Sequence, residues 1–288
     1  MDRSLDQFYQ VALALTLWIT GLGLGMSFGP GQILRTLRRG GLFARATVLD
    51  VVIVPLLVWG LVQAFSIPDH YATGLLLVGV ASAGPLGIKA AQLARADLPY
   101  AIALVVVLEA ANVVAIPVWV ALLLPPGVQV PMWPVVRTLL LLVLAPLAVG
   151  MAVRARRPPT AARLAQLAAP LSTVGLLVVI AIVLARYARI VLDVFVAVGP
   201  AALTAVLLAL LLGWLLGGPG RPTRAATSLV TGVRANGPAL AIAQASFPSL
   251  AAVSVAIVAF GMFSVLLPVS FAIVAGRTAE PERPSTTV

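Results

Sequence analysis

Apolar blocks, each long enough to cross a lipid bilayer as an α-helix, dominate the sequence. Such a helix needs about 20 predominantly apolar residues, and segments rich in basic residues, glycine or proline separate nine blocks of roughly this size. The blocks are residues 8–28, 46–65, 72–95, 98–124, 134–153, 164–186, 190–216, 225–247 and 250–275. The chain is 61% hydrophobic and 10% charged, so it lacks the polar residues that a water-soluble domain needs at its surface. We therefore predict an all-α, multi-pass membrane protein with nine transmembrane helices.

The composition also argues against several kinds of chemistry. The chain has no cysteine, which removes disulfides, thiolate nucleophiles and cysteine-ligated metals. The only histidine, His70, lies outside the predicted spans, and no span carries paired carboxylates, so an intramembrane enzyme is a remote alternative. The basic residues are scattered and form no patch, which argues against a nucleic-acid partner. We expect no cofactor, no metal and no obligate protein partner.

The basic residues also predict the orientation of the chain in the bilayer. Cytoplasmic loops of membrane proteins carry an excess of Lys and Arg. With nine spans and the N-terminus outside, most of the 19 basic residues lie in inner loops, whereas Arg3, Arg137, Arg186 and Arg189 lie outside. We therefore predict a cell (inner) membrane protein with an external N-terminus and a cytoplasmic tail, residues 276–288.

Two of the nine predicted spans are interrupted near their middle. Gly84-Pro85 interrupts span 72–95, and Gly237-Pro238, preceded by Asn236, interrupts span 225–247. Proline removes a backbone donor and glycine tolerates unwound backbone, so each span is predicted to consist of two half-helices. The two segments also resemble each other, as GPLGIKAAQ and GPALAIAQ. Matched interruptions in oppositely oriented halves are typical of the binding site of a secondary transporter.

The motifs that surround these interruptions resemble the bile acid:sodium symporter superfamily. The matching stretches are GLGLGMSF, LLLVGVASAGPLGIKAAQLARAD and TGVRANGPALAIAQASF. The resemblance implies an inverted-repeat fold with a panel domain and a core domain, in which the two broken helices cross. Relatives with ten helices have two five-helix repeats, and we expect this chain to lack the first of these helices. It implies a first repeat of four helices over 1–124, with its broken helix at 72–95, and a second repeat of five over 125–288, with its broken helix at 225–247.

The sodium-binding side chains that the resemblance implies are largely missing. In sodium-coupled relatives a Ser-Asn pair follows the first break, and this pair aligns with Gly87 and Ile88. The Glu and Gln positions near the second break align with Val230 and Arg234, and further hydroxyl positions align with Ala101 and Val105. Sodium is therefore a possible but disfavoured coupling ion. A related arsenite permease is disfavoured as well, because those proteins typically use a cysteine.

Two cations lie close to the predicted breaks. Lys89, the only lysine, is four residues after Pro85, and Arg234 is three residues before Gly237. Charges at membrane depth are costly and usually mark a function or an ion pair. We expect both to offset the charge of a small organic anion, in place of sodium, together with the half-helix N-termini. The predicted substrate-binding residues are Lys89, Arg234, Asn236, Gly84, Pro85, Gly237 and Pro238. The alternative for Lys89 is a side chain that extends to the cytoplasmic surface.

Three polar residues within spans are candidates for ion coupling: Glu109, Asn112 and Thr231. Buried carboxylates in general either pair with a cation or serve as proton carriers, so Glu109 either pairs with Lys89 or Arg234 or supports proton coupling. Asn112 and Thr231 are also suited to hydrogen bonds within or between helices. The alternative function is thus a sodium- or proton-coupled symporter that uses Glu109 and backbone carbonyls.

Two further patterns predict packing and not chemistry. Asp50 lies near Arg45 at the start of span 46–65, which predicts an ion pair at the membrane interface. Gly21 and Gly25 are four residues apart and share one helix face, which is typical of a close helix–helix contact.

Overall fold

The computed structural model describes residues 3–27, 36, 40–124, 132–247 and 251–278, and every regular element among them is a helix. The first half comprises α1 (Arg3–Ser27), α3 (Gly40–Val48), the π-helical segment η1 (Leu49–Ile53), α4 (Val54–Ala64), α5 (Asp69–Val80), α6 (Leu86–Leu93) and α7 (Leu98–Leu123). The second half comprises α8 (Met132–Leu139), the π-helical segment η2 (Leu140–Leu144), α9 (Ala145–Arg156), α10 (Pro158–Arg186), α11 (Ala188–Leu216), α12 (Arg221–Gly232), α13 (Asn236–Ser246) and α14 (Ala251–Arg277). The predicted all-α class is confirmed.

Seven helices among the described residues are long and apolar enough to cross a membrane. They are Gln7–Ser27, Gly40–Ala64, Leu98–Leu123, Met132–Arg156, Pro158–Arg186, Ala188–Leu216 and Ala251–Arg277, and each corresponds to one predicted span. The other two predicted spans, 72–95 and 225–247, each contain two shorter helices. The count of nine crossings stays a prediction. The predicted tail 276–288 begins inside α14, and its residues 279–288 lie outside the described part.

Apolar side chains cover much of the outer surface as well as the interior. On α10, for example, Leu167, Leu171, Val174 and Leu177 are all more than half exposed and recur every three or four residues. This spacing places them on one face of the helix. An exposed apolar face of this length would be unstable in water, and in a bilayer it contacts lipid.

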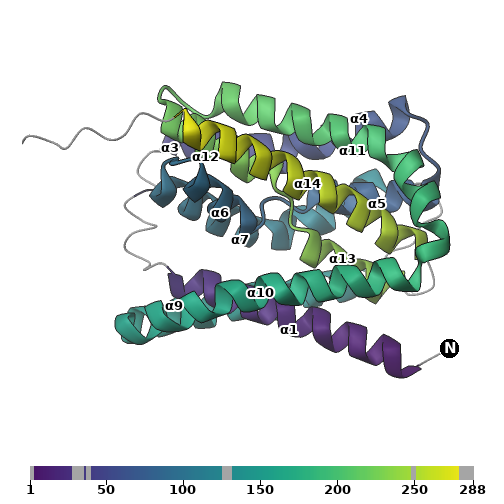
Figure 1. Cartoon of the computed structure of the whole chain (residues 1–288), viewed down its shortest axis with the longest axis horizontal. Coiled ribbons are helices and arrows are strands. Elements are labelled where there is room, and N and C mark those ends of the chain that lie inside the picture. Colours follow the sequence, from purple (N-terminus) through teal and green to yellow (C-terminus); the bar gives the residue numbers. More distant parts are fainter. Residues whose placement is uncertain (1–2, 28–35, 37–39, 125–131, 248–250, 279–288) are drawn as a thin grey trace, which may run out of the picture.

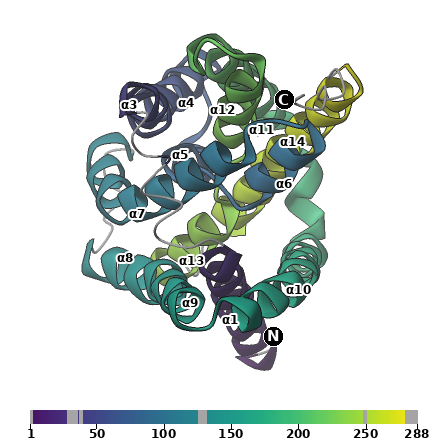
Figure 2. The same cartoon turned by 90° about the vertical axis from the view of Figure 1, so that its left-hand side faces the viewer.

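The helices form two groups that face each other. Figures 1 and 2 show α1, α9 and α10 together along one side, with the broken helices and α14 on the other. Close packing of α1 on α9 depends on glycine, because a Cβ on Gly25 would collide with the backbone of Leu147 and Met151, and one on Gly21 would meet Pro146. The predicted Gly21/Gly25 contact face is thus confirmed.

The two predicted breaks are present, but the glycine-proline pairs stand at the start of the second half-helices. The first break covers residues 81–85, between α5 and α6, and the second covers residues 233–235, between α12 and α13. Pro85 immediately precedes α6, and Pro238 is in the first turn of α13. A proline costs little there, because the first backbone N–H groups of a helix have no partner within the helix.

Other groups satisfy the backbone that the breaks leave free. The Asn112 side chain accepts a hydrogen bond from the Ser82 backbone N–H at 3.1 Å and donates one to the Ser82 carbonyl at 2.8 Å. The Ala235 N–H donates to the Ala81 carbonyl at 3.1 Å, which joins the two breaks directly. Non-helical backbone inside a membrane requires partners of this kind.

Candidate functional site

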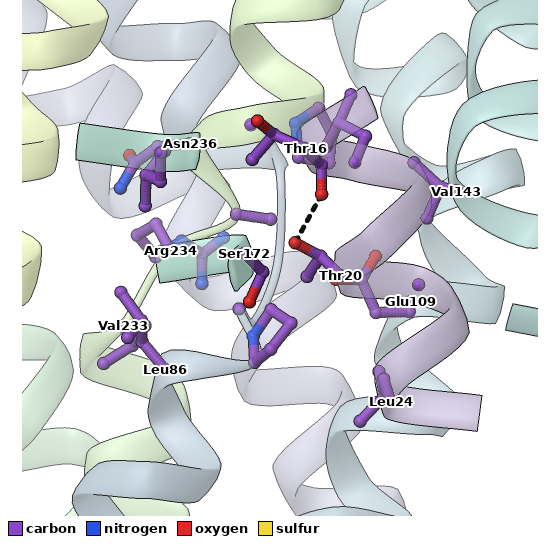
Figure 3. Close-up of a pocket in the computed structure, with 18 of the residues that line it drawn as sticks. Thr16, Thr20, Leu24, Leu86, Glu109, Val143, Ser172, Val233, Arg234 and Asn236 are labelled. Carbon is purple, nitrogen blue, oxygen red and sulfur yellow. Dashed lines mark hydrogen bonds between the residues drawn. The ribbon is translucent and has the colours of Figure 1, made fainter. Parts of the chain in front are cut away.

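A cavity lies where the two breaks meet the group formed by α1, α9 and α10. Its volume is about 110 Å³, which is ample for more than one water molecule, since a water needs roughly 10–15 Å³ on this scale. The breaks contribute Gly84, Pro85 and Arg234, and the start of α13 contributes Asn236, Gly237 and Pro238. Lys89 on α6 and Glu109 on α7 line the cavity as well. All seven predicted substrate-binding residues therefore line one cavity, and Figure 3 labels two of them, Arg234 and Asn236. Whether they bind a substrate stays a prediction.

Two half-helices begin at this cavity. Pro85 and Leu86 at the start of α6, and Asn236 to Pro238 at the start of α13, are among its lining residues. The N-terminal end of a helix carries a partial positive charge and backbone N–H groups that lack helical partners. Two such ends directed at one space favour an anionic ligand.

Lys89 connects α6 to the opposite group of helices. Its ammonium donates hydrogen bonds to the Thr173 hydroxyl at 2.8 Å and to the Ala169 carbonyl at 3.3 Å, both on α10. Lys89 also lines a second cavity between α1, α6 and α10, which shares Thr20, Leu24, Pro85 and Ser172 with the first. The lysine thus lies between the two cavities. Among the described residues its partners are neutral oxygen atoms, and none of them neutralises its positive charge.

Arg234 lines the cavity, but its charge is paired. The side chain is 1% exposed, and its Nη1 lies 3.0 Å from Oδ1 of Asp50, whose side chain is fully buried. The guanidinium also donates to the carbonyls of Val78 and Gly79 at the end of α5. Three oxygen atoms from two separate helical elements thus hold one guanidinium beside the first break.

The position of Asp50 contradicts the predicted ion pair with Arg45. Asp50 does not pair with Arg45 at the interface, since Arg45 is exposed whereas Asp50 is buried. Residues five apart do not share a helix face, and Asp50 lies in the π-helical segment η1, directed at the second break. Its other oxygen, Oδ2, accepts a hydrogen bond from the Thr231 hydroxyl at 2.9 Å.

The three ion-coupling candidates occupy different environments. Thr231 and Asn112 are fully buried, and their contacts with Asp50 and Ser82 stabilise the breaks. Glu109 lines the cavity and is 5% exposed. Its Oε2 is buried without a hydrogen-bond partner. Among the residues that the structure describes, neither Lys89 nor Arg234 forms an ion pair with it, so the structure does not contain the pairing that the sequence left open as one alternative.

Several lining residues had no signal in the sequence. Thr16 and Thr20 on α1, and Ser172 and Thr173 on α10, bring hydroxyl groups to the cavity. Each stands in a long apolar helix where such hydroxyls usually bond their own backbone. Only the packing of α1 and α10 against the breaks reveals that they surround a cavity. No group of three or more His, Cys, Asp or Glu side chains that could hold a metal occurs in the described part of the chain.

Comparison with known proteins gives a family for the chain. The model of the sodium bile acid symporter family matches residues 12–194, which is more than half of the sequence and includes the first break, Lys89 and Glu109. The match ends before the second break. No curated protein matches the chain.

Proposed function

Because the chain belongs to the sodium bile acid symporter family, we propose that it is a secondary transporter of a small organic anion, which binds in the cavity between the two breaks. The observation that carries this proposal is the convergence of both half-helix N-termini and the Lys89 ammonium on one cavity. An anion there would meet the partial positive charges of the two helix ends and the full charge of Lys89, whose side chain is exposed. The family is a family of transporters, which disfavours an enzyme.

The same proposal includes the topology that the sequence predicts. The chain crosses the inner membrane nine times, with its N-terminus outside, and its repeats are residues 1–124 and 125–288. The group of α1, α9 and α10 corresponds to the panel, and the two broken helices belong to the core. Alternating access arises when these two groups move relative to each other. The contact of Lys89 with Thr173 and Ala169 crosses their boundary, so this contact has to break during transport.

Arg234 takes the role of a coupling cation in this proposal. The Asp50 carboxylate and the carbonyls of Val78 and Gly79 form an oxygen-lined space beside the break. Oxygen ligands of this kind suit hard metal cations, and the guanidinium fills the space. A cation that belongs to the chain makes a bound sodium ion unnecessary for the stability of the break.

The alternative is a symporter driven by protons or sodium through Glu109. It is favoured by one observation, the buried carboxyl oxygen without a partner in the wall of the cavity. In this case transport of the anion would follow the proton or sodium gradient, and Glu109→Gln would abolish that dependence.

Thermal unfolding of the purified protein in detergent tests the proposal. Ligands that bind only the folded state raise the unfolding midpoint by mass action. We expect small organic carboxylates or sulfonates to raise it and exchange of choline for sodium to leave it unchanged. Lys89→Gln should remove the response to the anions. Arg189→Gln is the matched control, because Arg189 is exposed and does not line the cavity. A saturable rise with sodium would instead favour the symporter alternative.

A further inference from the structure

The cavity wall also contains an acidic side chain, Glu109, for which a simple anion provides no partner. Glu109 lies at the middle of α7, is 5% exposed, and has one carboxyl oxygen that is buried without any partner. A carboxyl group in such a place is costly, and it persists where it has a function or a partner. Among the described residues, the two positive side chains of the cavity wall have other partners, Arg234 with Asp50 and Lys89 with Thr173 on α10.

The hydroxyl groups of the cavity do not supply the missing donor. Thr16 donates to the Ala12 carbonyl at 2.7 Å, and Thr20 donates to the Thr16 carbonyl at 2.7 Å (Figure 3). Ser172 donates to the Ala169 carbonyl at 3.0 Å. Each hydroxyl has only one hydrogen, so these side chains present oxygen lone pairs to the cavity. These three hydroxyl groups therefore do not donate to Glu109, and its Oε2 stays without a hydrogen-bond partner.

Outside the Arg234–Asp50 pair, the cavity wall has one basic and one acidic side chain. Arg234 and Asp50 neutralise each other, which leaves one ammonium, Lys89, and one carboxyl, Glu109. A ligand with a single negative charge pairs with Lys89 and leaves Glu109 without a partner. A ligand with one charge of each sign has a partner for both side chains.

We propose that Glu109 is a direct ligand contact that accepts a hydrogen bond from a protonated amine, so that the transported acid is a small zwitterion. This rests on the proposed function, because it assumes that the acid group of the substrate binds near Lys89 and the two half-helix N-termini. Glu109 then selects amino acids or aminosulfonates over the corresponding plain acids. It acts on specificity and is not required as a proton carrier.

The experiment compares ligands that differ only in the amine. Binding is measured from the thermal midpoint of the detergent-purified protein, titrated with ω-amino acids of three to six carbons and with the matched unbranched carboxylic acids. Taurine and ethanesulfonate provide a second pair. Because a hydrogen bond to a charged group is worth more than one between neutral groups, we expect the best amino acid to bind roughly tenfold or more tightly than its plain acid.

Variants separate this inference from the proposed function. Glu109→Gln should remove the preference for the amine and keep binding of the plain acid, and Lys89→Gln should weaken both ligands. The matched control is Asp193→Asn, since Asp193 is exposed and lies outside the cavity, and it should keep the preference. Equal binding of the two members of every pair to the unaltered protein overturns the inference, whether or not the variants fold. An amine preference that survives Glu109→Gln also overturns it. If neither ligand of any pair binds, the proposed anion transport is contradicted, and the inference that rests on it is overturned as well.

Discussion

Removal of the Arg234 guanidinium should destabilise the protein strongly, because it leaves a charge buried and unpaired. In Arg234→Ala the Asp50 carboxylate, which is fully buried, loses its counter-charge, and the carbonyls of Val78 and Gly79 lose their donors. Loss of one partner of a buried ion pair costs about 3–5 kcal/mol. Since two carbonyls lose donors as well, we expect a value near the top of that range.

Such a loss is measurable as a shift of the unfolding midpoint. For chains of 150–250 residues, 1 kcal/mol corresponds to about 2–4 °C, so the midpoint of Arg234→Ala should fall by roughly 10 °C or more. Scanning fluorimetry of the detergent-purified protein, with intrinsic tryptophan as the probe, provides the assay. Arg189→Ala, which removes an exposed arginine, should shift the midpoint by no more than about 1 °C.

A double-mutant cycle tests the physical cause. Asp50→Asn alone leaves the guanidinium without its counter-charge and should cost about as much as Arg234→Gln alone. In the double variant both charges are gone, so the combined loss should fall short of the sum by at least about 1.5 kcal/mol. Additive losses would show that the two side chains act independently, and the ion pair would then not be the reason for the effect.

Three further outcomes follow from the packing and the breaks. Sodium, exchanged for choline at constant ionic strength, should raise the unfolding midpoint of Arg234→Ala and leave that of the unaltered protein unchanged. A response of both proteins, or of neither, would contradict the proposal that the guanidinium occupies a cation site. Asn112→Leu removes both partners of the Ser82 backbone and should lower stability by about 2–4 kcal/mol, because unpaired buried polar groups are costly, whereas a loss below about 0.5 kcal/mol would mean that water replaces the amide. Gly25→Ala should lower the midpoint by several degrees, because the new Cβ collides with the backbone of α9, while Gly60→Ala, which meets no atom within 4 Å, should be neutral or stabilising by about 0.5–1 kcal/mol. Equal effects of the two glycine variants would show that α1 and α9 separate without cost.

The helices can be predicted from the sequence where long apolar runs are bounded by glycine, proline or basic residues. Long apolar runs locate seven helices, and the Gly84-Pro85 and Gly237-Pro238 pairs identify the two interrupted spans. The exact breaks were missed by a few residues, because in both spans the proline stands at the start of the second half-helix. Boundaries of this kind depend on backbone torsions, such as the positive φ of Ala83. An alanine in the sequence does not predict such a torsion.

The partners of the buried charges could not be predicted from the sequence. Asp50 and Arg234 are 184 residues apart, and the residues around each of them do not indicate that the two side chains form a pair. Proximity along the chain suggested Arg45 instead. One signal was available, since an acid within the apolar run LDVVIV requires a partner if it is buried. The candidate site residues beside the breaks were found because the breaks bring distant segments together, whereas the hydroxyls on α1 and α10 depend on tertiary packing alone.

The guanidinium beside the break has an energetic consequence. A diffusible ion adds the free energy of its own gradient to every cycle, whereas a side chain that never leaves the protein adds none. If Arg234 takes the place of a coupling ion, as we propose, the substrate moves only under its own concentration difference and the membrane potential. That potential is worth about 2.3 kcal/mol per elementary charge for each 100 mV. A monoanion would be driven out of a cell that is negative inside, whereas a zwitterion crosses without electrical work, toward the side where it is more dilute.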